Sequence, residues 1–213
     1  MILKRALAAC VAVLLAGSAH ALTLSQDFNN GSLNGFGVIN LGAGSIANGG
    51  PDGADDPYMS IEDTGSGFMD VTFNSDWLGD LSAFDGATFS ADFIQTDQAT
   101  GGYLDGFGEI RITGGGRTIG ADVILVDPTD VWQSASAVLT AELFGVTQSQ
   151  WEETLADVTV FAIRAESWSN PSETVGYDNF KLVSTTAPVP LPAGGVLLLT
   201  GLGALVLRRK MRG

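Results

Sequence analysis

Residues 86–95 read Gly86-Ala-Thr-Phe-Ser-Ala-Asp-Phe-Ile-Gln95, and this stretch decides the fold. Its apolar residues Phe89, Ala91 and Phe93 are separated by single polar residues. Successive side chains of a β-strand point to opposite faces, so a period of two predicts a strand with one buried and one polar face.

Similar short runs recur outward from this stretch, between turn-forming pairs such as Asn30-Gly31 and Asp85-Gly86. The predicted strands are 22–28, 86–95, 108–113, 119–126, 131–139, 158–166 and 175–183. Short strands separated by turn signals are typical of an all-β sandwich. We expect one helix over 147–158, because Thr147 and Gln150 have the spacing of a capping box, and Trp151 is expected to anchor it in the core.

The charge of the chain is unevenly distributed. Residues 22–186 contain all 24 acidic residues but only four of the ten basic ones, which gives this segment a net charge of −20. Such a surface repels nucleic acid and anionic membranes and attracts cations. The one cysteine and the one histidine, Cys10 and His20, precede the segment. A disulfide, a cysteine nucleophile, a Ser-His-Asp triad and a His/Cys zinc site are therefore excluded within it.

The N-terminal residues 1–21 have the three regions of an export signal. Lys4 and Arg5 form a basic start, residues 6–17 are apolar, and Ala19-His20-Ala21 has the small residues of a cleavage site. This order predicts a signal helix that signal peptidase removes, and not a first membrane span.

The C-terminal residues 187–213 combine a proline-rich linker, an uncharged apolar run from Ala193 to Leu207, and a basic end with four cations. The prolines separate this tail from the preceding domain. The apolar run predicts a short transmembrane helix, and the basic end predicts that its last residues stay in the cytoplasm. The expected domains are thus a signal peptide, 1–21, a β-sandwich, 22–186, and a sorting tail, 187–213.

Several segments of the sandwich are similar to laminin B (domain IV) modules. They are Gln26–Phe36, Trp77–Phe93, Trp132, the helix at 148–158, Arg164 and Gly176-Tyr-Asp-Asn-Phe-Lys-Leu182. The resemblance implies a jelly-roll β-sandwich related to carbohydrate-binding modules, with extracellular polysaccharide as the ligand class. Residues 40–67 depart most from that pattern, and we expect a long Gly/Asp-rich loop there.

The tail resembles PEP-CTERM sorting signals through the motif Val189-Pro190-Leu191-Pro192-Ala193, which stands ahead of the apolar run and the basic end. This resemblance implies processing by an exosortase-type transpeptidase in a Gram-negative bacterium. It implies an exported precursor anchored in the inner membrane, and a mature protein at the cell surface or in the extracellular matrix.

A structural Ca²⁺ site is one interpretation of the acidic residues. Asp178 shares strand parity with Phe180 and Leu182, so we expect it to face the interior, where a carboxylate needs a partner. Calcium prefers carboxylate and carbonyl oxygens, and the predicted further ligands are Asp52, Asp55 and Asp56. The alternative is a hydrogen bond from backbone amides or from Arg164 to Asp178.

A polar sheet face is the predicted ligand-binding surface. It would combine residues of several strands and a neighbouring loop: Asp92, Glu109, Arg111, Arg164, Glu166 and Trp168, with Ser90 and Tyr103 nearby. Arginine and carboxylate groups suit sugar hydroxyls, and an aromatic ring can stack on a sugar. The alternative is a solvated outer face whose ion pairs contribute little.

The sequence therefore predicts a non-enzymatic, exported binding module for polysaccharide. A structural surface protein without a small ligand is the second reading. A secreted glycosidase using two carboxylates is the third, although no motif singles out such a pair.

Overall fold

The computed structural model describes residues 21–40, 42–65, 68–97, 106–166 and 173–185. Residues 22–185 group into one unit by their contacts. Apart from Ala21, the predicted signal peptide lies outside the described residues, as does the predicted tail helix. No helix within the described part is long and apolar enough to cross a membrane.

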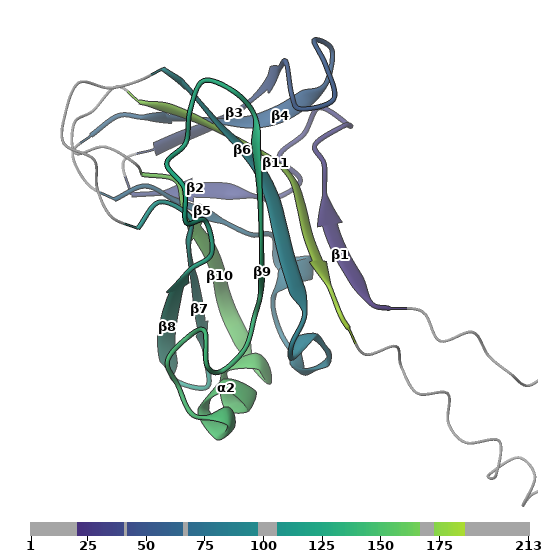
Figure 1. Ribbon diagram of the computed structural model, residues 1–213, viewed down its shortest axis with the longest axis vertical. Helices are drawn as coiled ribbons and strands as arrows, with labels where there is room; N and C mark the ends of the chain where they lie inside the picture. Colours follow the sequence, from purple (N-terminus) through teal and green to yellow (C-terminus); the bar gives the residue numbers. More distant parts are fainter. Residues whose placement is uncertain (1–20, 41, 66–67, 98–105, 167–172, 186–213) are drawn as a thin grey trace, which may run out of the picture. The chain divides into compact units, whose positions relative to one another are not determined.

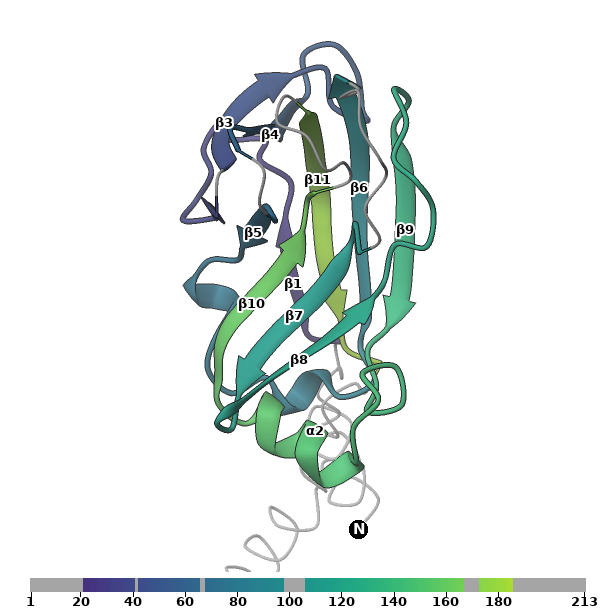
Figure 2. The ribbon, with the colours of Figure 1, turned by 90° about the vertical axis from the view of Figure 1, so that its left-hand side faces the viewer.

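Two antiparallel sheets pack face to face (Figures 1 and 2). The sheet containing β6, here called the β6 sheet, has the strand order β3-β4-β11-β6-β9, and β1 also pairs with β11. Its strands are β1 (Thr23–Gln26), β3 (Gly42–Asn48), β4 (Pro57–Asp63), β6 (Thr88–Asp97), β9 (Gln133–Val138) and β11 (Thr174–Val183). The predicted strand at 86–95 is confirmed as β6, and it lies next to the last strand.

The opposite layer, here called the β7 sheet, has the order β2-β5-β10-β7-β8. Its strands are β2 (Gly37–Ile39), β5 (Asp70–Thr72), β7 (Glu109–Gly114), β8 (Arg117–Asp122) and β10 (Val158–Arg164). Strands β7 and β8 form a hairpin around Gly115 and Gly116, whose φ values of 55° and 75° favour glycine at such a tight turn.

Aromatic side chains fill the space between the sheets. Phe73 lies near the centre, with its ring centroid 5.0 Å from that of Phe161 and 4.8 Å from that of Phe180. These three rings come from a loop, the β7 sheet and the β6 sheet, so their contacts hold the two layers together. The predicted apolar face of β6 is confirmed, because Phe89, Ala91 and Phe93 are all buried.

The helix α2 (Gln148–Leu155) closes one end of the sandwich, near the β7–β8 hairpin (Figure 2). Thr147 and Gln150 form the predicted capping box. Trp151 is fully buried, stacks on Phe144 and donates its indole N–H to Asp85, 2.7 Å away. The prediction of a core anchor is confirmed. Two short 3₁₀ helices, η1 (Ser75–Trp77) and η2 (Ser82–Phe84), precede β6.

The prediction of a long loop over residues 40–67 is wrong. The chain there forms the antiparallel hairpin of β3 and β4. Gly42 and Gly44 lie within β3, where there is no room for a side chain. A Cβ at Gly42 would collide with Val38 and Met69, and one at Gly44 would lie 3.0 Å from Val38. These glycines permit close packing of a strand, and the segment between β3 and β4, residues 49–56, is a turn.

The predicted face of Asp178 is also wrong. The register between β11 and β6 shifts between Asp178 and Lys181, and Asn179 has a φ of 51°. This bulge inserts one residue, so Tyr177 and Phe180 both lie in the core. Asp178 instead stands opposite Asp92, on the outer side of the β6 sheet, although it is buried as expected.

Candidate functional site

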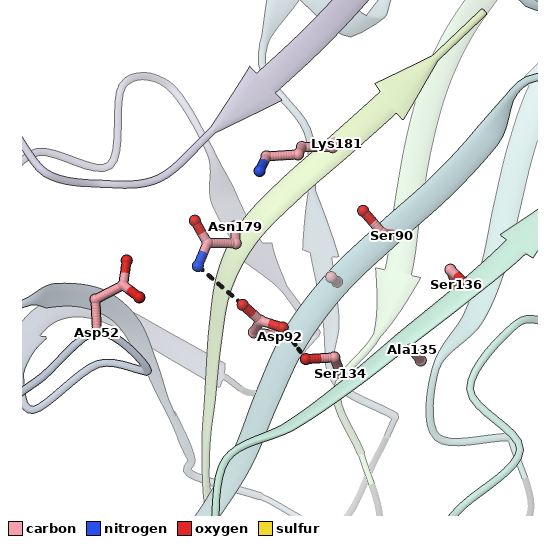
Figure 3. Close-up of a pocket in the computed structure, with 9 residues that line it drawn as sticks. Asp52, Ser90, Asp92, Ser134, Ala135, Ser136, Asn179 and Lys181 are labelled. Atoms are coloured by element: carbon pink, nitrogen blue, oxygen red, sulfur yellow. Dashed lines mark hydrogen bonds between the residues drawn. The ribbon is translucent and has the colours of Figure 1, made fainter. Parts of the chain in front are cut away.

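A pocket of about 420 Å³ lies on the outer face of the β6 sheet (Figure 3). Strands β6, β9 and β11 form its floor. Its lining is mainly hydroxyl, amide and charged groups: Asp52, Ser90, Ala91, Asp92, Ser134, Ala135, Ser136, Asn179 and Lys181. Small side chains on neighbouring strands leave this face hollow.

Strand register arranges the floor in two rows. Lys181, Ser90 and Ser136 are cross-strand partners in one row. In the next row, Asp92 accepts a hydrogen bond from the Ser134 hydroxyl and, at 2.8 Å, one from the Asn179 side-chain amide. Asp92 is thereby fixed in orientation, as the dashed bonds in Figure 3 show.

A charged network covers part of the opposite outer face, on the β7 sheet. Asp70 of β5 is fully buried and makes an ion pair with Arg111 of β7. Arg164 of β10 lies between the two acids, with Nη2 3.0 Å from Glu109 and Nε 3.7 Å from Asp70. Asn40 also donates to Asp70, at 3.2 Å. A buried carboxylate thus holds two arginines in place.

Small residues lie beside Arg111 in the same cross-strand row. Ala162 of β10 and Gly120 of β8 are its direct partners, and Thr72 of β5 continues the row. A Cβ at Gly120 would press against Glu109 and the stem of Arg111. Glycine therefore lets these charged side chains lie across the sheet.

An aromatic ring borders this network. The Arg164 guanidinium carbon lies 4.1 Å from the centroid of Phe68, and Phe68 is 48% exposed. One side of the arginine plane is thus covered by an aromatic ring, an arrangement that favours a fixed guanidinium.

The predicted polar face is therefore divided between two surfaces. Glu109, Arg111 and Arg164 are brought together as expected, whereas Asp92 lies on the outer face of the other sheet. This part of the prediction is wrong, because β6 and β7 belong to different sheets. Trp168 and Tyr103 lie outside the described residues. Sequence reasoning missed Asp70, whose only signal is its position between the apolar residues Met69 and Val71.

Glu166 belongs to neither outer surface, contrary to the prediction. It is 1% exposed, and among the described residues neither carboxylate oxygen makes a well-formed hydrogen bond, although the backbone of Met69 acts to lower its pKa. Burial raises its pKa to about 8, with further contributions from the nearby carboxylates of Glu173 and Asp63. All three residues are buried: Asp63 is the last residue of β4, Glu166 follows β10, and Glu173 directly precedes β11.

Asp178 has a different environment from Glu166. Its Oδ1 accepts the amide hydrogen of Asn179 at 2.7 Å, which matches the alternative of a backbone partner. Burial raises its pKa to about 7, and Asp56, Asp92 and Asp27 contribute by repulsion.

Of the predicted calcium ligands, only Asp56 is placed near Asp178 by this electrostatic contact. Asp52 lines the outer pocket, and Asp55 is exposed. Within the described ranges, no three acidic, histidine or cysteine side chains are arranged to hold a metal ion.

No family model matches the chain, and a search of curated proteins also finds no match. Solved structures do match. An exo-β-agarase has a TM-score of 0.55 at 14% identity, over 82% of this chain and 26% of the agarase chain. The chain thus spans about a quarter of that protein.

The CBM22-1 xylan-binding domain of Paenibacillus barcinonensis Xyn10C has a TM-score of 0.51 at 12% identity, over 81% of this chain and 99% of the domain. The L4b domain of human laminin α-2 has a TM-score of 0.46 at 11% identity, over 67% of this chain and 84% of the domain. The predicted jelly-roll β-sandwich is confirmed by the two sheets and by the fold shared with the xylan-binding domain. The laminin resemblance itself stays a prediction.

Proposed function

We propose that residues 22–186 are a non-catalytic carbohydrate-binding module and that polysaccharide docks on the outer face of the β7 sheet. The observation that carries this proposal is the pair of arginines held by the fully buried Asp70. Arg111 remains 31% exposed, so its fixed guanidinium can still donate to a ligand. The sandwich fold is also that of a xylan-binding domain, which is consistent with this ligand class.

Rigidity is what makes this surface suitable for a sugar. A guanidinium carries its donors in a planar fork, and ordering a free arginine on binding would cost about 2 kcal/mol of side-chain entropy. Arg111 and Arg164 have already lost this freedom through Asp70, Glu109 and the Phe68 ring. The exposed ring adds an apolar surface of the kind that sugar rings contact.

The same pairing argues against a glycosidase at this face. A glycosidase needs one carboxylic acid that donates a proton to the leaving group. Asp70 is fully buried and cannot reach a sugar, and Glu109 is ion-paired with Arg164, so the network offers no two carboxylates open to a substrate. Asp70 and Glu109 are therefore poor candidates for that acid.

Binding to a panel of neutral and acidic polysaccharides tests the proposal. Arg111→Lys keeps a cation beside Asp70 but removes the planar fork, and Arg111→Ala removes both. We expect each to lower affinity by about tenfold or more. Arg117→Ala is the matched control, because Arg117 lies on β8 and pairs with the exposed Glu153. Wild-type protein that binds no polysaccharide, or an Arg111→Lys variant that binds like wild type, would contradict this site.

The proposed cellular route follows from the two termini. We propose export through the signal peptide at 1–21 and removal of the tail after the Val189–Ala193 motif by an exosortase-type enzyme of a Gram-negative cell. The mature acidic domain would then be released to the surface or matrix. Mass spectrometry of the secreted protein tests this route, and a mature form that still carries Arg208–Gly213 would show a permanent anchor instead.

A structural Ca²⁺ beside Asp178 is proposed as a stabilising ligand. Asp56 and Asp27 contribute to the electrostatic environment of this buried carboxylate, and a divalent cation would relieve their repulsion. Since no three potential ligands are already arranged among the described residues, these side chains would have to move toward the ion. Calcium added after chelation should raise the melting temperature of wild type but not of Asp178→Asn. An unchanged wild-type melting temperature would exclude the site.

A further inference from the structure

The pocket on the outer face of the β6 sheet contains unused hydrogen-bonding groups. The Ser90 and Ser136 hydroxyls make no side-chain hydrogen bond within the described structure, although both line the pocket. Each hydroxyl can donate one hydrogen bond and accept two. This floor therefore offers donors and acceptors to a ligand across two adjacent strands.

Lys181 is unusual among the basic residues of the sandwich. The other three cations, Arg111, Arg117 and Arg164, each make an ion pair with an acidic residue. Lys181 makes none with the described acids, although acidic residues outnumber basic ones six to one in this segment. Its ammonium stands at one end of the row that contains Ser90 and Ser136 (Figure 3).

Local charge indicates which ligand fits. Asp52 and Asp92 line the same pocket, so two carboxylates accompany the single ammonium. A polyanion would be repelled both by this local excess and by the net charge of the domain. A neutral polyol avoids that penalty, because its hydroxyls can donate to Asp92 and accept from Lys181 and the serines.

We propose that this pocket is a second saccharide site, which takes one or two neutral sugar units of a polysaccharide through hydrogen bonds. None of the described residues that line the pocket is aromatic, so the recognition we propose there uses hydroxyl geometry and not ring stacking. The volume of about 420 Å³ falls within the range of small-molecule pockets.

The second site rests on the proposed function, because two sites matter only if the β7 sheet also binds polysaccharide. The outer faces of the two sheets of a sandwich point away from each other, so a module with a site on each face holds two polymer chains. Each site alone binds weakly, and a repeating polymer converts weak sites into avid binding. The module is then a cross-linker of polysaccharide and not only a ligand of it.

Backbone NMR titration of the full chain with neutral xylan- and agarose-derived hexasaccharides separates the two sites. Saturating sugar should shift the amides of Ser90, Ser136 and Asn179 independently of those of Arg111 and Gly120. Ser90→Leu removes the central hydroxyl of the floor and fills part of the pocket, so it should weaken only the first set, by at least about tenfold.

Thr88→Leu is the matched control, because Thr88 lies two residues earlier on the same face of β6, is also half-buried, and does not line the pocket. Lys181→Met removes the ammonium and keeps most of the apolar stem. It should weaken the same set without unfolding, since Lys181 is exposed.

The outcomes distinguish the two proposals. If only the amides around Arg111 shift, the second site is refuted and the proposed function stands. If only the pocket amides shift, the second site stands and the proposed β7 site fails. If no amides shift with any sugar, both fail. Equal effects of Ser90→Leu and Thr88→Leu would also refute the second site.

Discussion

Glu166→Gln should stabilise the protein at neutral and alkaline pH, although it changes a single atom type in the core. Glu166 is buried, and within the described ranges both carboxylate oxygens lack a well-formed hydrogen bond. Its pKa is raised from 4.5 to about 8, first by burial and then by Glu173 and Asp63. The folded protein therefore keeps this proton at pH values at which the unfolded chain has released it.

The sign of the pH dependence follows from proton binding. Between pH 4.5 and about 8 the folded state binds more protons at Glu166 than the unfolded state does, so the free energy of unfolding falls as pH rises through this window. The loss is complete above the folded pKa. Each pKa unit corresponds to about 1.4 kcal/mol, but relaxation and water entry reduce the full value, and we expect a cost of about 2 kcal/mol.

Glutamine has nearly the same volume and cannot ionise, so it should recover most of this free energy. At pH 8.5 the variant should melt about 4–8 °C above wild type. Near pH 4.5 the two should melt within about 2 °C of each other, because the wild-type carboxyl is then protonated in the folded state and half protonated in the unfolded state. Thermal unfolding from pH 4.5 to 8.5 in chelator measures the difference.

Glu62→Gln is the matched control for this prediction. Glu62 lies on β4 next to Asp63 but is exposed, so its replacement should leave the melting temperature within about 1 °C of wild type at every pH. A Glu166→Gln protein that is less stable than wild type at pH 8.5 would refute the reasoning. So would a stability difference that does not vary with pH.

Three further predictions concern stability. Asp85→Ala should cost about 1–3 kcal/mol in chemical denaturation, because it leaves the buried Trp151 N–H without its acceptor, whereas Trp151→Phe in the same background should recover part of that loss. Asn179→Ala should lower the free energy of unfolding by about 1–2 kcal/mol, and Asn179→Gly by less, because glycine and asparagine adopt a φ near 51° more readily than alanine. Equal melting temperatures of the two variants would contradict this. Asp70→Asn should lower the free energy of unfolding in urea by about 3 kcal/mol, because it removes the carboxylate charge that pairs with the partly buried Arg164. An unchanged urea midpoint would show that Asp70 does not stabilise the arginines.

Alternation along the chain was sufficient to predict most of the strands. Phe89, Ala91 and Phe93 face the core, and the strands at 108–113, 158–166 and 175–183 lie within two residues of β7, β10 and β11. The alternation of apolar and polar residues depends only on neighbouring residues, so it can be recognised in a single sequence. The capping box at Thr147 is local as well, and it begins α2 as predicted.

The missed elements depend on contacts between distant residues. Strand β3 contains Gly42 and Gly44, and glycine is ordinarily a turn signal. In β3, glycine is needed because Val38 of another strand packs closely against positions 42 and 44. This contact between distant residues cannot be read from the local sequence. The bulge in β11 had one available signal: Tyr177 and Phe180 are three residues apart, so both can be buried only if the alternation breaks between them.

The candidate surface was only partly predictable for the same reason. Glu109 and Arg111 share parity within one strand, so their common face could be expected. The membership of β6 and β7 in different sheets could not, because strand order depends on long-range pairing. Asp92 was therefore grouped with Arg111, although the two side chains lie on opposite sides of the sandwich.

The positions of the four cations of the sandwich bear on the proposed ligand. The segment contains 24 acidic residues and only these four basic ones. Arg111 and Arg164 are fixed by the buried Asp70, and Lys181 stands without an ion pair in the described part of the chain. Both outer faces thus present a cationic hydrogen-bond donor within an acidic segment. If polysaccharide binds as proposed, long-range repulsion from the acidic surface should disfavour acidic polymers, and these short-range donors should favour neutral ones.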